Sequence, residues 1–113
     1  MNIFKMKTFD DIKSGDTMYI RFVDNDSKHT TLLRKFTVKE SIKRVDGLTE
    51  FTFGEKFDEI YLLKSESSKS KFWTGKNTYC YSDKQMLLYD LYNEKEEYIR
   101  RIDDMIESIG IMR

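Results

Sequence analysis

The chain changes character at residue 82, and residues 82–110 read SDKQMLLYDLYNEKEEYIRRIDDMIESIG. Ser82, followed three residues later by Gln85, matches a capping box, the side-chain pattern that opens many helices. Neither proline nor glycine interrupts residues 83–109, and Gly110 is placed to end a helix. Apolar side chains recur at spacings of three and four, at Leu88, Leu91, Tyr92, Tyr98, Ile99, Ile102, Met105, Ile106 and Ile109. The stretch predicts one long amphipathic helix.

Residues 1–81 show instead the two-residue hydrophobic alternation of short strands separated by turns. Glycine-containing turns are expected at 14–16, 46–47 and 75–76. In the connection 8–13, Phe9 and Ile12 are expected to point inward. Strands are expected at 17–23, 31–42, 48–53, 57–64, 71–74 and 77–81, with a further candidate at 3–7.

Two segments of this region bear on the details of the sheet. The longest expected strand, 31–42, carries Lys35 and Lys39 on a face that should meet water. Its other face is expected to hold Leu32, Phe36, Val38 and Ile42. Residues 65–70 are rich in serine and lysine and are expected to form a loop.

Five or six short strands in about eighty residues favour a small closed or half-closed barrel, because closure protects the sheet edges. The predicted class is α+β and mostly β. Residues 1–113 form a single domain, with a β-barrel part at 1–81 and a C-terminal helix at 82–110. Such a helix spans roughly 40 Å, whereas a barrel of this size is only about 25 Å across. We therefore expect the helix to extend past its barrel.

Two short stretches are similar to known small proteins. Residues 12–20, IKSGDTMYI, resemble the opening strand of SH3-like barrels, in which a lysine-x-glycine-aspartate turn leads into an alternating strand. Residues 75–85, GKNTYCYSDKQ, resemble the last strand and helix start of short uncharacterised proteins of Firmicutes and their phages, which end in a capped C-terminal helix. The resemblance implies a small SH3-like antiparallel barrel with a terminal helix, in a mobile-element setting. It implies no reaction.

Composition limits the classes of protein that this chain can represent. Twenty basic and twenty acidic residues cancel, and 39% of the residues are hydrophobic, so a folded core is expected and a disordered chain is excluded. The single cysteine excludes a disulfide scaffold. No apolar stretch is long enough for a membrane span or a signal-peptide core. The absence of proline and alanine is typical of A/T-rich coding, so we expect a cytoplasmic protein of a bacterial host, encoded by that bacterium, a phage or another mobile element.

Candidate catalytic residues are few. His29 is the only histidine and Cys80 the only cysteine, which is too little for a zinc site of three or four ligands. No glycine-rich phosphate loop is present. We therefore expect no enzyme activity, no metal and no cofactor.

Nucleic-acid binding is an alternative that the charge pattern leaves open. Residues 28–44 and 64–76 are both basic, whereas residues 46–62 are acidic. Small barrels bind single strands by stacking bases on aromatic side chains beside a basic groove. The residues expected to serve such a groove are Arg34, Lys35, Lys39, Lys69, Lys71, Trp73 and Lys76.

The favoured interpretation is a protein–protein binding module. An apolar stripe longer than one small barrel can cover needs another protein surface, and a homodimer through the helix is one way to cover it. The helix can instead fold back as a lid on its own barrel, and parallel and antiparallel pairing both remain open. Size and expected source make an inhibitor of a host defence protein, such as a CRISPR nuclease, one candidate. The expected contact residues are Leu91, Tyr98, Ile99, Ile102, Met105, Ile106 and Ile109.

Overall fold

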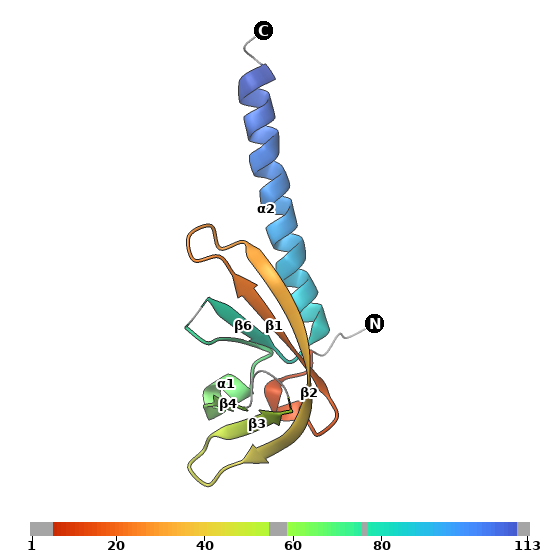
Figure 1. Cartoon of the computed structure of the whole chain (residues 1–113), viewed down its shortest axis with the longest axis vertical. Coiled ribbons are helices and arrows are strands. Elements are labelled where there is room, and N and C mark those ends of the chain that lie inside the picture. The colour runs from red at the N-terminus through yellow and green to blue at the C-terminus, as the bar shows by residue number, and fades with distance from the viewer. Residues whose placement is uncertain (1–5, 55–58, 76, 111–113) are drawn as a thin grey trace.

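A computed structural model describes residues 6–54, 59–75 and 77–110 (Figure 1). Its helices are η1 (Phe9–Asp11, a 3-10 turn), α1 (Lys64–Ser67) and α2 (Lys84–Gly110). Its strands are β1 (Thr17–Val23), β2 (Thr30–Lys43), β3 (Thr49–Phe53), β4 (Glu59–Leu62), β5 (Lys71–Trp73) and β6 (Thr78–Tyr81). The predicted architecture is confirmed: a mostly β, curled half-barrel precedes one long C-terminal helix.

All six strands belong to one antiparallel sheet in the order β4-β3-β2-β1-β6-β5. The sheet can curl because the 14-residue strand β2 takes part in both halves, pairing with β1 along its first part and with β3 along its second. A bulge between Val38 and Glu40 separates the two parts, and bulges bend a strand and increase its twist.

The bulge corrects one detail of the predicted strand. Beyond it Ser41 pairs with Phe51, whose side chain is buried, whereas Ile42 pairs with Glu50. Directly opposed residues of an antiparallel pair share a face, so Ile42 does not share the face of Phe36 and Val38. Leu32, at the other end, is on the expected face but is 44% exposed.

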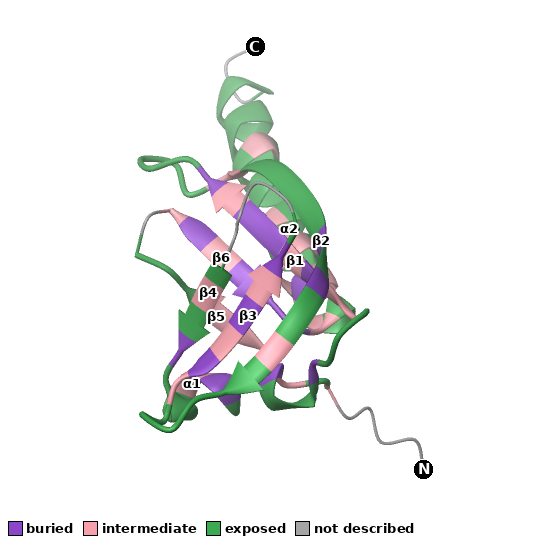
Figure 2. Cartoon of the chain, turned by 60° about the horizontal axis from the view of Figure 1, so that its bottom comes forward, coloured by how far each residue is buried: buried purple, intermediate pink, exposed green. Residues whose placement is uncertain are grey.

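The hydrophobic core lies inside the curl of the sheet (Figure 2). Phe9 and Ile12 pack into it as expected, and the Phe9 ring lies 6.2 Å from that of Phe51. The alternation of buried residues along β3, and along β1 as far as Ile20, follows the two-residue period of the sequence, and Arg21, which is also buried, interrupts it. The core cluster consists of Phe9, Ile12, Met18, Ile20, Phe36, Val38, Phe51, Phe53, Leu62 and Cys80.

Two predicted segments differ from the structure. The expected loop 65–70 begins instead with the single helical turn α1, where the Glu66 carboxylate accepts the Leu63 N–H at 2.8 Å and Ser67 is buried. In the expected strand 3–7, Met6 and Lys7 are not in a strand, and residues 1–5 lie outside the described part. Residues 57–58, predicted as the start of a strand, also lie outside it.

The start of α2 also differs from the prediction. Oδ1 of Asp83 accepts the N–H groups of Gln85 and Met86 at 2.7 and 3.2 Å, which makes Asp83 the capping residue. The Ser82 hydroxyl, expected to cap, donates instead to the carbonyl of Lys7 at 2.6 Å. The helix therefore begins at Lys84, two residues after the predicted boundary.

Candidate protein-binding surface

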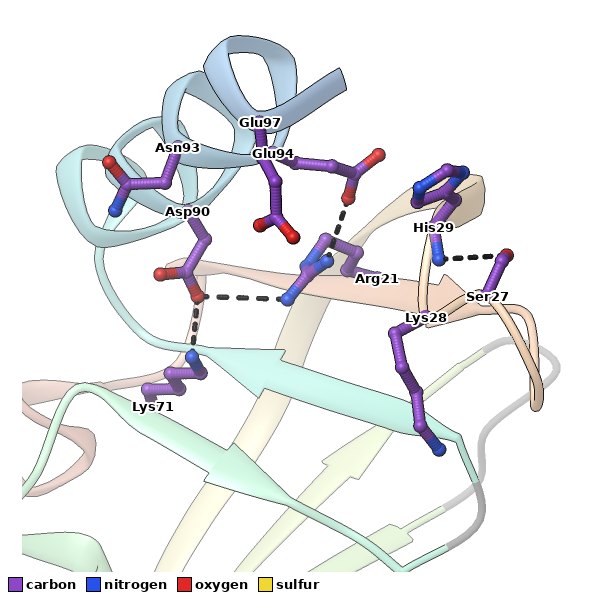
Figure 3. A pocket seen from close by; sticks show the side chains of 9 residues that line it. All are labelled: Arg21, Ser27, Lys28, His29, Lys71, Asp90, Asn93, Glu94 and Glu97. Atoms are coloured by element: carbon purple, nitrogen blue, oxygen red, sulfur yellow. Dashed lines mark hydrogen bonds and ion pairs between the residues drawn. The ribbon is translucent and has the colours of Figure 1, made fainter. Parts of the chain in front are cut away.

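Helix α2 crosses the outer face of the sheet, opposite the core, and Arg21 of β1 fixes it there (Figure 3). The Arg21 side chain is only 8% exposed, and its Nη1 donates to Oε1 of Glu94 at 3.2 Å. Its Nη2 lies 3.7 Å from Oδ2 of Asp90, one helical turn earlier. The guanidinium carbon also lies 4.7 Å from the centre of the Tyr79 ring. One buried cation thus joins two turns of α2 to the sheet.

Asp90 receives further donors from the strands below it. The Tyr81 hydroxyl donates to Oδ2 of Asp90 at 2.6 Å, and Nζ of Lys71 on β5 lies 2.7 Å from the same oxygen. Tyr81 in turn accepts a hydrogen bond from Nε of Arg21 at 2.9 Å. Burial, and after it the hydrogen bond to Asp90, raises the pKa of the Tyr81 phenol, so this group remains a donor at neutral pH.

The hairpin that joins β1 to β2 provides the last contacts along the helix. The Thr30 hydroxyl and N–H both donate to the Glu94 carboxylate, at 2.5 Å for the hydroxyl. Nη1 of Arg101 lies 2.9 Å from Nε2 of His29, and the Tyr98 ring meets the His29 ring edge-on at 6.0 Å. Within the described residues, Tyr98 and Arg101 are the last side chains of α2 for which the structure shows a hydrogen bond or ring contact with the half-barrel.

Beyond Arg101 the helix extends past the half-barrel, as the sequence predicts (Figure 1). The apolar stripe continues along this part: Met105 is 54% exposed, Ile106 62% and Ile109 69%. Tyr98 and Ile99 are about half exposed, whereas Leu91 and Ile102 are of intermediate burial. We call residues 102–110 the tip of α2.

At the other end of α2, an apolar groove of about 340 Å³ runs between the helix and strands β1 and β2. Its floor is formed by Tyr19, Leu33, Leu87, Leu88 and Leu91. Three cationic residues, Arg34, Lys35 and Lys84, line it as well. We call this feature the base groove. Because Leu88 and Leu91 belong to the same stripe as Ile102, Ile106 and Ile109, the groove and the tip lie at two ends of one largely apolar helical face, which Lys95 interrupts between them.

The residues weighed for catalysis do not come together. Cys80 faces the core, is 0% exposed, and burial raises the pKa of its thiol to about 12, which leaves it protonated at neutral pH. His29 instead contacts Arg101 and Tyr98 on the outer side. In residues 6–54, 59–75 and 77–110 no group of three or more histidine, cysteine or acidic residues is placed to hold a metal ion.

The residues expected to bind nucleic acid fall into two groups. Arg34, Lys35 and Lys39 lie on β2, whereas Lys69 precedes β5 and Lys71 and Trp73 lie on it. Strands β1 and β6 separate β2 from β5, and Asp90 and Glu94 of α2 lie over those two strands. Lys71 is bound to Asp90. Trp73 is 56% exposed, and Lys76 lies outside the described residues.

Sequence reasoning missed the residues that hold the helix in place. The sequence places Arg21 within the expected strand 17–23 and singles out neither Asp90 nor Glu94. A signal was present: Asp90 and Glu94 are spaced by four on the helix, and Arg21 is the one charge within the strand 17–23. The partner of each residue follows only from the strand register and the path of α2.

Comparison of the chain with family models, curated proteins and solved structures finds no match. No helix in the described part of the chain is long and apolar enough to cross a membrane.

Proposed function

We propose that this protein is a non-enzymatic protein-binding module of the bacterial cytoplasm, and that it binds through the apolar face of α2. One observation carries the proposal: the stripe continues into the tip, where Met105, Ile106 and Ile109 are each more than half exposed. Fully burying one such side chain contributes about 1.5–3 kcal/mol relative to leaving it in water. Several aligned on one helical face make a surface that a partner protein can cover.

The support for a binding role comes from how α2 is held. The helix is fixed by partly buried polar contacts at Asp90 and Glu94, so the half-barrel presents it in one orientation. An oriented amphipathic helix is a common recognition element, because its face fits an apolar groove or a second helix. A second copy of the chain is the first partner to consider, and inhibition of a host defence protein such as a CRISPR nuclease is another form that such binding can take.

The test is a pair of matched substitutions on the tip. Ile106→Asp places a carboxylate in the stripe, and Ser108→Asp places the same group about 160° around the helix. Both residues are exposed, so both variants should keep the wild-type circular dichroism spectrum. We expect Ile106→Asp, but not Ser108→Asp, to abolish self-association in sedimentation velocity, or retention of a purified partner protein where one is known. Equal behaviour of the two variants in every binding assay contradicts the proposal.

A second candidate, a binder of single-stranded nucleic acid, has one observation in its favour. The exposed Trp73 ring lies 6.4 Å from the Tyr79 ring at an interplanar angle of 30°, and such aromatic pairs can stack bases. This candidate predicts salt-dependent retention of an oligonucleotide that falls on Trp73→Ala. Absence of a gel shift at low salt excludes it.

A further inference from the structure

The two ends of the apolar surface on α2 carry opposite charge. At the base groove, Lys35 and Lys84 have no carboxylate partner within the described residues. At the tip, residues 102–110 contain Asp103, Asp104 and Glu107 and no cation. The nearest cation before the tip, Arg101, is bound to His29. The groove is therefore apolar and basic, and the tip is apolar and acidic.

From this complementarity we infer that the occupant of the base groove is the α2 tip of a second copy, in an antiparallel two-fold dimer. The inference rests on the proposed function, because it uses the same helical face, and it names the partner and its orientation. Each copy offers one groove and one tip, so a single two-fold axis satisfies both and the assembly closes as a dimer.

The charge pattern distinguishes the two possible orientations. Parallel pairing sets Asp103 and Glu107 beside their own copies, and sets Lys84 beside Lys84. Antiparallel pairing sets acids beside cations at both ends, and like charges placed together cost free energy whereas opposite charges stabilise. A register with the axis near residue 97 places Leu88 beside Ile106 of the second copy and Lys84 within one turn of its Glu107.

Engineered cysteines test the orientation directly, because the native Cys80 is fully buried. Leu88→Cys and Ile106→Cys are prepared as separate proteins, then oxidised alone and as an equimolar mixture. We expect a disulfide-linked dimer in the mixture and little in either protein alone. A link within each single variant is the parallel result and overturns the inference while leaving the protein-binding proposal intact. A dimer that forms no link in any mixture also overturns it.

Charge exchange provides a second, independent readout. Lys84→Glu and Glu107→Lys should each weaken dimerisation about three- to tenfold in sedimentation equilibrium, and the double variant in one chain should recover most of the loss. Lys43→Glu, an exposed change on the part of β2 that pairs with β3, is the matched control. Failure of the double variant to recover affinity overturns the groove–tip contact. A wild-type monomer at high micromolar concentration excludes a second copy as the occupant, and a partner of another sequence then remains for the proposed function.

Discussion

Arg21 of β1 and Glu94 of α2 stand 73 positions apart in the sequence, and a 3.2 Å hydrogen bond joins the Nη1 of one to the Oε1 of the other. This contact lies on the outer face of the sheet, where the helix has few apolar neighbours: among its residues only Leu87 is buried. The orientation of α2 therefore depends on a polar cluster more than on hydrophobic packing.

Replacing Arg21 by alanine should destabilise the protein by roughly 2–4 kcal/mol. The substitution leaves the partly buried carboxylates of Asp90 and Glu94 without their shared cation, although Lys71 still reaches Asp90. Urea unfolding followed by circular dichroism measures the change. Arg34→Ala, at an exposed position on the neighbouring strand, should stay within about 0.5 kcal/mol of wild type. A similar loss for both variants would contradict the role assigned to Arg21.

Cys80 should be unreactive in the native protein. Its thiol is fully buried with its pKa raised to about 12, so both access and ionisation limit attack on a disulfide reagent. We expect no colour with a thiol reagent at pH 8 until urea unfolds the chain. Rapid native-state labelling would show that the core opens at this strand.

The raised pKa of the Cys80 thiol also predicts a loss of stability in alkali. The unfolded thiol ionises near its ordinary pKa of 9, whereas the folded thiol is held protonated to about 12. A raised folded-state pKa stabilises the fold fully below pH 9, and this contribution is lost as the pH rises from 9 towards 12. The free energy of unfolding should fall over that interval, and the fall should be smaller in Cys80→Val. Equal slopes for the two proteins contradict this assignment.

At the start of α2, Asp83→Ala should cost about 1 kcal/mol through loss of the N-cap. The carboxylate also accepts the N–H of Lys7 at 2.7 Å, which ties the described N-terminal residues to the helix. Asp83→Asn, whose side chain can cap equally well, should recover most of the stability. Thermal unfolding of the two variants compares them, and an alanine variant as stable as wild type would rule out Asp83 as the cap.

Acid should weaken the turn that precedes β1. The N–H of Lys13 donates to Oδ2 of Asp16 at 2.9 Å, and the ammonium of Lys7 lies 3.3 Å from the same oxygen. The Lys13 hydrogen bond first, and Lys7 after it, lower the pKa of Asp16 below its ordinary 3.8. The stabilisation is therefore present above pH 3.8 and lost as the pH falls below it. Asp16→Asn should show a smaller loss between pH 5 and pH 2 in urea unfolding; an unchanged loss contradicts the role of this carboxylate.

Local pattern was sufficient for much of the fold. The strand 17–23 has the predicted bounds, and the helix ends at the predicted Gly110. The predicted face of Ile42 was wrong because strict alternation assumes an uninterrupted strand. The sequence around Val38 has no glycine to mark the bulge. The prediction of Ser82 as the N-cap was wrong because serine and aspartate are both good caps. The hydrogen bond from Ser82 to Lys7 leaves Asp83 to cap the helix.

Of the candidate protein-binding surface, the sequence likewise predicted one part and missed another. The stripe from Ile102 to Ile109 follows from helical spacing alone, so the sequence predicted the tip. The base groove could not be predicted, because Tyr19 and Leu33 reach Leu88 only through the pairing of β1 with β2 and the path of α2. Site residues on one element can be inferred from periodicity, whereas those that several elements bring together need the register.

Because Tyr98 and Arg101 make the last polar and ring contacts with the half-barrel among the described residues, the tip is a cantilever about 13 Å long. A cantilever magnifies any tilt at its support into a sideways displacement at its free end. A substitution at Arg21 that turns the support by a few degrees therefore moves Ile109 more than it moves Asp90. Mutations that impair assembly should then be found in the polar cluster under the helix as well as at the points of contact.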